Sequence, residues 1–313
     1  MLVFNITRTH PVAFLLVGIP GLEHLHMWIS IPFFFAYTPA LLGNCTLPFI
    51  IQADSALHEP MYLFLALLAT IDLVLSSTTL PKMLAIFWLR DRETNFYACL
   101  VQMFFLHSSI MESAVLLAVA FDRYVAICRP LHYTTILTKP LIIKIGVAAV
   151  TRAVTLMTPL PFLLRRFHYC RGTAIAHCYC EHMAVVRLAC GDTWFNNIYG
   201  IAVAMFIVVL DLLFVVLSYI FILQAVLQLA SPEAGYKAFR TCVSHIGAIL
   251  STYTPVVISS VMYHVARRAA PHVHILLAIF YLLFPPMINP IIYGVKTKQI
   301  WDHVFSLFWR KVV

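Results

Sequence analysis

The densest group of metal-ligating and redox-active side chains is a six-residue string, His177-Cys178-Tyr179-Cys180-Glu181-His182. Imidazole and thiolate groups suit copper or zinc, so the string has the composition of a metal site. In an oxidising compartment such thiols form disulfides instead, and Cys99, Cys170 and Cys190 supply partners. We favour disulfides over a metal. The five cysteines allow two bridges and leave one thiol over.

Two acidic residues form a second group, because each interrupts a long apolar stretch. Asp72 and Glu112 each cost about 2.5 to 3.5 kcal/mol in a membrane unless something compensates them. Either the pair shares a cation or a proton, or both carboxyls are protonated and hydrogen-bonded to nearby Ser or Asn. Arg152 and Asp211 are the other charged residues in apolar stretches, and we expect them to serve packing or interfacial anchoring.

A third group, Asp122-Arg123-Tyr124, ends an apolar stretch that begins near Cys99. The 24 residues of helix from Cys99 to Arg123 would span about 36 Å, which is one membrane crossing. Arg123 is therefore expected at the opposite face of the membrane from Cys99. An ion pair between neighbouring residues is worth little where water reaches it, so the tripeptide alone is weak support for a function.

The elements that carry these groups belong to a membrane protein. Of the 313 residues, 62% are hydrophobic and 11% are charged, and the mean hydropathy is +0.89, whereas soluble domains carry about 25% charged residues. The net charge of +8 is divided among short segments between apolar stretches. It forms no continuous basic face, so a nucleic-acid partner is not expected.

Seven apolar stretches are long enough to cross a bilayer as helices. Continuous apolar stretches lack the alternation of a β-barrel, so helices are the remaining spanning structure. We predict an all-α membrane protein, a seven-transmembrane helix bundle with a short amphipathic surface helix over Thr297–Arg310. The predicted spans are residues 27–51, 61–81, 96–121, 145–164, 198–230, 241–266 and 273–295.

The orientation follows from a glycosylation sequon at Asn5, which requires an extracellular N-terminus. Cys99, Cys170, Cys178, Cys180 and Cys190 fall on the same side as this sequon, where disulfides form. No cleaved signal is apparent at the start of the chain. We therefore expect a multi-pass plasma-membrane protein with three parts. These are an extracellular N-terminus over 1–26, the bundle over 27–295 and a cytoplasmic tail with the surface helix over 296–313.

Five motifs at successive positions resemble those of odorant receptors, which are G-protein-coupled receptors. Gly18–Leu22 and His177–Met183 further resemble the class I, or fish-like, branch, nearest its family 52. The five motifs are Gly43-Asn44, Pro60–Leu65, Ala120–Tyr133, Lys237–His245 and Asn289–Tyr293.

The resemblance implies a receptor that binds a small odorant and activates a stimulatory, olfactory-type heterotrimeric G protein. It implies disulfides Cys99–Cys180 and Cys170–Cys190, which leave Cys178 free, and a sodium or proton site at Asp72 and Glu112. Activation and G-protein coupling would involve Asp122, Arg123, Tyr124, Tyr219, Arg240, Asn289, Pro290 and Tyr293.

An apolar ligand pocket with few polar anchors is expected in the outer half of the bundle. Ordinary helix packing is at least as good an explanation for each of its residues taken singly, so only the cluster carries weight. The cluster comprises His107, Ser108, Met111, Met183, Gly200, Val203, Ser260, Tyr263 and His264.

This chain departs from the family pattern at two important places. Tyr263-His264 stands where class I relatives usually have His-Arg, so the usual anchor for a carboxylic acid ligand is replaced. The interval from Cys99 to Arg123 is also one residue shorter than the family's, which would rotate the outer part of the third helix by about 100°. A transporter or channel is the alternative function. An enzyme is not expected, because no HExxH, GxSxG or phosphate-binding motif occurs.

Overall fold

The structure is a computed structural model that describes residues 10–108, 110–228, 232–265 and 271–296. The predicted glycosylation site at Asn5 and the predicted surface helix over Thr297–Arg310 lie outside the described residues.

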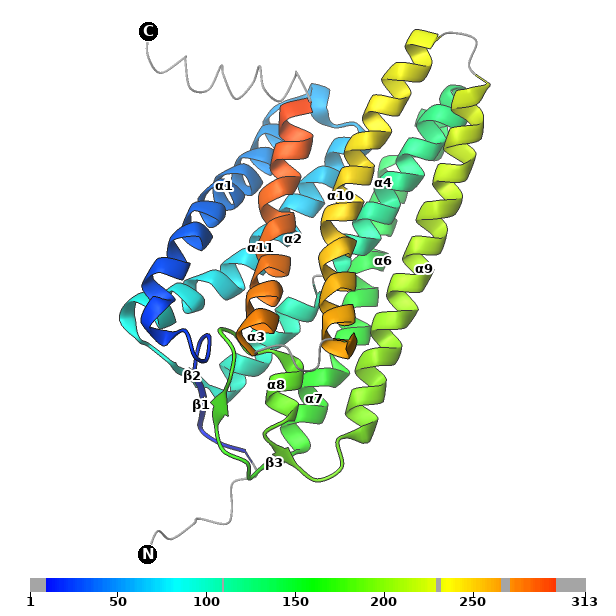
Figure 1. Cartoon of the computed structure of the whole chain (residues 1–313). Helices are drawn as coiled ribbons and strands as arrows, with labels where there is room; N and C mark the ends of the chain where they lie inside the picture. The colour runs from blue at the N-terminus through cyan, green and yellow to red at the C-terminus, as the bar shows by residue number, and fades with distance from the viewer. Residues whose placement is uncertain (1–9, 109, 229–231, 266–270, 297–313) are drawn as a thin grey trace, which may run out of the picture.

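Most of the described chain is helical, and the long helices run side by side in one elongated bundle (Figure 1). The helices are α1 (His26–Ala53), α2 (Pro60–Leu84), α3 (Phe96–Ser108), α4 (Met111–Cys128), α5 (Tyr133–Ile136), α6 (Lys139–Met157), α7 (Pro159–Arg166), α8 (His182–Val186), α9 (Trp194–Leu227), α10 (Pro232–Val265) and α11 (Pro271–Lys296). Short helical turns are η1 (Glu23–Leu25), η2 (Ser55–Leu57), η3 (Ala85–Leu89) and η4 (Pro130–His132).

Six helical segments of the described chain are long and apolar enough to cross a membrane. The 34-residue helix α10 packs against α11 and α4 and completes the bundle. The six segments are Glu23–Ala53, Pro60–Leu89, Phe96–Cys128, Lys139–Arg166, Trp194–Leu227 and His272–Ile292.

The helices extend beyond the apolar stretches that predicted them. Helix α10 begins at Pro232 rather than at residue 241, and α6 begins at Lys139 rather than at residue 145. Apolar composition marks only the part of a helix in hydrocarbon, whereas backbone hydrogen bonding continues the helix into water. Helix boundaries are therefore wider than hydropathy indicates.

Two spans are each divided into two helices. The fourth is divided at Thr158, because the prolines at 159 and 161 lack the backbone donors that an uninterrupted helix needs. The third span ends as α3 at Ser108 and resumes as α4 at Met111, within the interval that we expected to be one residue shorter than the family's.

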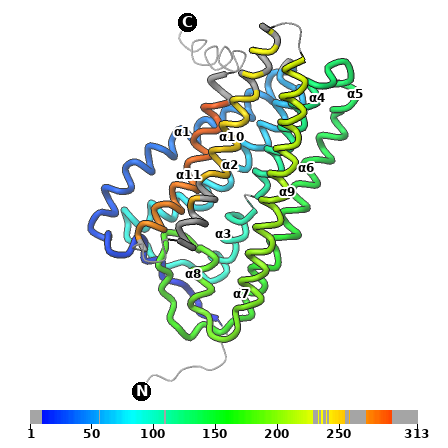
Figure 2. The backbone as a smooth tube through the Cα atoms, turned by 45° about the vertical axis from the view of Figure 1, so that its right-hand side comes forward, coloured from blue at the N-terminus to red at the C-terminus, as the bar shows by residue number. Residues whose placement is uncertain are grey.

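Five short strands lie at one end of the bundle, which we call the strand end (Figure 1). Figure 2 shows α7 and α8 at the same end. The strands are β1 (Ala13–Leu16), β2 (Glu93–Asn95), β3 (His168–Tyr169), β4 (Ala174–Ile175) and β5 (Ala189–Cys190). Strand β1 lies between β2 and β4, antiparallel to β2 and parallel to β4, with Ala13 opposite Asn95 and Leu15 opposite Ala174. The other pair, β3 and β5, is antiparallel.

The strand end has its own apolar core, to which the N-terminal strand contributes. Phe14, Leu16 and Ile19 are buried against residues of α2, α3, α8 and α11. A second cluster, built from α1, α2, α4, α9 and α10, fills the half of the bundle nearer the opposite end. The N-terminal strand is thus part of the packed structure at the strand end.

Candidate functional site

The two membrane-embedded acids that the sequence singles out lie together in the middle of the bundle. Asp72 of α2 and Glu112 of α4 are both buried, and their carboxyl groups are within hydrogen-bonding reach of each other. The side-chain amide of Asn289 in α11 donates to Asp72 Oδ2 over 3.0 Å. Three helices therefore meet at one polar centre.

Several oxygens at this centre lack a hydrogen-bond donor in the described part of the chain. They are Asp72 Oδ1, Glu112 Oε1 and Asn289 Oδ1. Two carboxyl oxygens in contact need a shared proton or a cation between them, since like charges in a buried site repel strongly. The oxygen-only donor set also fits a hard cation such as sodium.

Helix α1 is held close to this centre by a small residue and an amide. The Asn44 amide donates to the carbonyls of Ala40, at 2.9 Å, and Pro286, at 2.7 Å. A Cβ at Gly43 would lie 2.6 Å from the Pro290 side chain, so only glycine permits this approach of α1 to α11. Pro290, which the sequence assigned to activation, is thus a helix contact.

A second buried polar cluster joins three helices about Asp211, which has a fully buried side chain in α9. Arg152 of α6 donates to Asp211 Oδ1 from Nη1 over 2.7 Å and to Oδ2 from Nη2 over 2.9 Å. Ser113 of α4 donates to Asp211 Oδ2 over 2.5 Å and accepts from Arg152 Nη2 over 3.0 Å. Arg152 and Asp211 therefore pack α6, α4 and α9 together.

At the end of the bundle opposite the strands, Asp122 is the shared partner of two side chains. Arg123 donates to Asp122 Oδ2 from Nε over 2.8 Å and also from Nη2, and the hydroxyl of Tyr133 in α5 donates to Asp122 Oδ1 over 2.7 Å. Burial, with the Asp122 carboxylate as a second cause, raises the pKa of Tyr133 above its ordinary value. The hydroxyl therefore keeps its proton and remains a donor.

Other residues assigned to coupling approach the same region from α9 and α10. The hydroxyl of Tyr219 lies 2.7 Å from Nδ1 of the buried His245, and the rings of Tyr124 and Phe221 are 6.0 Å apart. The side chains of Arg240 and Tyr293 lie outside the described residues, although their backbones are in α10 and α11.

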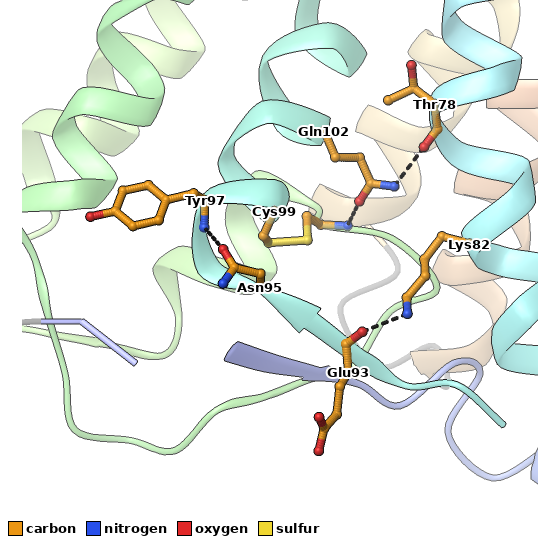
Figure 3. Close-up of a disulfide and its surroundings, with 8 residues drawn as sticks. Thr78, Lys82, Glu93, Asn95, Tyr97, Cys99 and Gln102 are labelled. Atoms are coloured by element: carbon orange, nitrogen blue, oxygen red, sulfur yellow. Dashed lines mark hydrogen bonds between the residues drawn. A yellow bond between two sulfur atoms is a disulfide. The ribbon is translucent and has the colours of Figure 1, made fainter. Parts of the chain in front are cut away.

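Both disulfides join the pairs that the family resemblance implies. Cys99 of α3 bonds to Cys180, and Cys170 bonds to Cys190 of β5. Figure 3 shows Gln102 beside the first bridge, where its amide connects two segments: Oε1 accepts from the Cys180 backbone over 2.9 Å and Nε2 donates to the Thr78 carbonyl over 3.0 Å. This links the loop before α8 to α2 and α3.

The remaining reactive residues of the six-residue string do not gather into a metal site. In the described parts of the chain, no group of three or more His, Cys, Asp or Glu is arranged to hold a metal ion. His177 accepts a hydrogen bond from the Cys178 backbone and contacts the ring of Tyr179. Glu181 caps α8 by accepting from the backbone of Met183 and Ala184. Cys178 is buried and forms no disulfide.

Part of the predicted ligand cluster comes together at the strand end of the bundle. His107 of α3 and His182 of α8 have ring centroids 5.7 Å apart, and a Cβ at Gly200 of α9 would lie 3.8 Å from His182. Val203 packs with Met157 and Leu160, while Ser108 is buried with no partner for its hydroxyl among the described residues.

Three members of the predicted cluster cannot be placed at side-chain level. Ser260, Tyr263 and His264 belong to α10, but their side chains lie outside the described residues. Met111 begins α4 and Met183 lies in α8, both half-buried.

His182 lies beside the predicted ligand cluster, although the sequence analysis considered its side chain only as a metal ligand. Its Nε2 lies within hydrogen-bonding distance of the Asn196 amide of α9, 3.1 Å from Nδ2 and 3.4 Å from Oδ1. Burial, followed by repulsion from His107, lowers the pKa of His182 to about 4 despite the bond to Asn196. At neutral pH the imidazole is therefore uncharged.

Sequence reasoning also missed the partners that complete each polar cluster. Ser113, Gln102 and Tyr133 are ordinary polar residues whose importance comes from contacts across 24 to 98 positions or from a shared acid. Of these three residues, only Tyr133 could have been found from the sequence, because it ends the motif that begins at Ala120.

Comparison with known proteins gives one consistent result over the whole chain. The family model described as Olfactory receptor matches residues 33–311. Human Olfactory receptor 52K1 is 86% identical over 312 residues, 99% of each chain, and human Olfactory receptor 52K2 is 83% identical over 308 residues, 98% of each. Olfactory receptor 51E2 of Rattus norvegicus is 48% identical over 301 residues, 96% of this chain and 94% of the relative.

Proposed function

Because this chain belongs to the olfactory receptor family, whose members are multi-pass G-protein-coupled receptors and not enzymes, we propose that it detects a small, mainly apolar odorant. The ligand binds in the strand-end half of the bundle and activates a stimulatory, olfactory-type G protein at the opposite end. The N-terminus is extracellular and the C-terminus cytoplasmic. The similarity along nearly the entire chain is the observation that carries this proposal.

The proposed ligand region is supported by the convergence of residues from three elements. His107, His182 and Gly200 approach one another from α3, α8 and α9. The Cys99–Cys180 bridge and the Gln102 amide hold the loop before α8 over this region. An uncharged His182 suits a mainly apolar ligand, which a charged imidazole would disfavour.

Signal transfer would use the two polar clusters between the ligand region and Asp122. The ligand must bind better to one of two conformations, because it shifts an equilibrium only by its differential affinity. The clusters of Asp72, Glu112 and Asn289 and of Ser113, Arg152 and Asp211 join the helices that such a change would move. The proposed change ends with reorganisation of Arg123 and Tyr219 and with movement of α10 to admit the G protein.

Sodium is the proposed ion at the central acids. Asp72 and Glu112 would hold it, with Asn289, which donates to Asp72 and has an unpartnered side-chain oxygen, as the neighbouring amide. When bound, the ion would supply the positive charge that two adjacent carboxylates need. The chain's own residues would then hold α1, α2, α4 and α11 in one arrangement.

The test is odorant-dependent cyclic-AMP production in cells that express the full chain, compared with Arg123→Ala at equal surface expression. We expect a concentration-dependent response in the wild type and its loss in the variant. Ligand-dependent ion or substrate flux that persists without a G protein would instead support a transporter or channel.

A further inference from the structure

A partly open concavity of about 440 Å³ lies at the strand end and is lined by four side chains, Glu23, His24, Arg90 and Arg92. Glu23 and His24 belong to η1, just before α1, while Arg90 and Arg92 lie between η3 and β2. Its size is within the range of about 300 to 1,000 Å³ typical of sites for small molecules. None of these residues belongs to the ligand region or the polar clusters described above.

The two arginines have unused binding capacity. The ion pairs found in the described residues involve Lys82, Arg123 and Arg152, and neither arginine of the concavity takes part. The Nε atom of Arg92 is buried and has no hydrogen-bond partner in the same part of the chain. A buried guanidinium nitrogen without an acceptor is unfavourable, and a negative charge beside the guanidinium would offset part of that cost.

Arg90 has a backbone conformation that is uncommon for its residue type. With φ of 57°, it is the one non-glycine residue with positive φ in the described chain. The left-handed conformation costs a side-chain-bearing residue about 1 to 2 kcal/mol, and such strained positions concentrate at ligand clamps and active sites. A glycine would adopt this turn without that cost. The fold therefore does not require an arginine at this position, which favours a binding role for its side chain.

The surroundings of the concavity place it at the membrane surface. Trp28 in the first turn of α1 is 71% exposed, and Leu89 in η3 is 76% exposed. Trp88 is also exposed, and its Nε1 donates to Ser30 Oγ over 2.7 Å, which connects η3 to α1. Tryptophan is enriched where lipid meets water. The exposed tryptophans beside the concavity therefore favour a position at the level of the lipid headgroups.

We propose that this concavity binds the headgroup of a zwitterionic glycerophospholipid. The phosphate interacts with Arg90, Arg92 and His24. The positively charged ammonium group of the headgroup interacts with the Glu23 carboxylate. The acyl chains extend along the exposed apolar side chains of α1 and η3. Guanidinium groups match phosphate oxygens through paired hydrogen bonds, and the acidic residue in the same concavity favours a zwitterion over a purely anionic lipid.

The first experiment measures lipid binding to the full-length receptor purified in a mild detergent, by native mass spectrometry. The probes are dioctanoylphosphatidylcholine, dioctanoylphosphatidylglycerol, dioctanoylglycerol and free phosphocholine. We expect phosphatidylcholine to be retained best, dioctanoylglycerol to be retained poorly, and phosphocholine to compete weakly because it lacks the chains. Displacement by phosphocholine as effective as by the lipid would overturn the assignment to a membrane lipid.

Two variants and a matched control identify the site. Arg90→Gln/Arg92→Gln should weaken phosphatidylcholine binding by about tenfold, since two charge-assisted contacts are lost. The control Arg165→Gln/Arg166→Gln removes the same charge from two exposed arginines at the end of α7. It should change phosphatidylcholine binding less than twofold. Equal effects of the two double variants would refute a specific site, and thermal unfolding in detergent checks that each variant is folded.

Glu23→Gln tests the amine contact separately. Removal of the carboxylate should weaken phosphatidylcholine binding and strengthen phosphatidylglycerol binding, so the preference between the two lipids reverses or disappears. An unchanged preference in Glu23→Gln would refute the zwitterion assignment.

Discussion

Arg152 and Asp211 form a two-point ion pair between α6 and α9, with Nη1–Oδ1 and Nη2–Oδ2 distances of 2.7 and 2.9 Å. The side chain of Asp211 is fully buried, whereas that of Arg152 is 22% exposed. The two partners should therefore respond differently when the other is removed. An isolated Asp211 has no access to water, but an isolated Arg152 can extend its long side chain toward a polar region.

The first prediction follows from this asymmetry. Arg152→Met should lower the free energy of unfolding by about 3 to 5 kcal/mol, the usual effect of leaving a buried charge unpaired. Asp211→Leu should be less damaging, and the double variant should recover most of the loss. Thermal unfolding of purified protein and surface expression measure these effects.

Asp91→Asn is the control for this series, because it removes the exposed partner of Lys82. An exposed pair contributes about 0 to 1 kcal/mol, so little change is expected. A double variant as unstable as Arg152→Met alone would show that the ion pair is not the reason for the loss.

The second prediction concerns sodium at Asp72 and Glu112. Replacing N-methylglucamine chloride by sodium chloride at constant ionic strength should raise the unfolding temperature of the wild type, since a ligand that binds only the folded state stabilises it. Asp72→Asn should abolish this increase, and Asp91→Asn should retain it. If sodium stabilises wild type and Asp72→Asn equally, the ion does not bind at this centre.

The third prediction concerns basal signalling. Tyr133→Phe removes the hydroxyl that donates to the Asp122 carboxylate and should raise ligand-free cyclic-AMP production about tenfold or more, because a hydrogen bond to a charged group contributes about 1.5 to 3 kcal/mol. Tyr97→Phe, which changes an exposed tyrosine at the strand end, is the matched control. Basal activity that does not differ between the two variants at equal expression would contradict this role.

The fourth prediction is a pH dependence of stability. The pKa of His182 is about 4 in the folded protein, below the ordinary value of about 6.5, so the unfolded chain binds more protons between these values. This contribution to stability is complete above about pH 6.5 and is lost as the pH falls toward 4. His182→Gln should therefore lose less stability between pH 7 and 5 than the wild type.

Part of the pH dependence should remain in that variant, because burial also lowers the pKa of His177 to about 3. Unfolding temperatures measured at intervals of half a pH unit give the slope of stability against pH for the wild type and for His182→Gln. An identical slope in wild type and His182→Gln would show that His182 does not titrate on unfolding.

The fifth prediction concerns ligand class and rests on the sequence at His264. A neutral imidazole makes a weaker carboxylate anchor than an arginine, so carboxylic acids should be weak agonists relative to alcohols and aldehydes. His264→Arg should lower the effective concentration of carboxylic acids by about tenfold. A strong acid response in the wild type that the variant leaves unchanged would remove residue 264 from ligand binding.

The seven-helix architecture was predictable from the sequence because lipid imposes a local requirement. Backbone groups in hydrocarbon must be satisfied within the same segment, so each apolar stretch has to be a helix whatever its neighbours are. The division of the fourth span beside Pro159 is local in the same way. The family motifs likewise implied the pairings Cys99–Cys180 and Cys170–Cys190 and the residues Asp72, Asp122 and Arg123.

The partners of these residues were decided only by tertiary structure. Asp211 had no predicted partner, yet Arg152 is 59 positions away in sequence and Ser113 is 98 positions away. Strand β1 pairs with β2 and β4, which no local alternation indicated, because segments this short form strands only when remote partners meet them. The concavity at Arg90 and Arg92 also depends on η1 lying beside the end of η3. Hydropathy is a property of each segment alone, whereas a buried charge, a strand or a binding site exists only where separate segments come into contact.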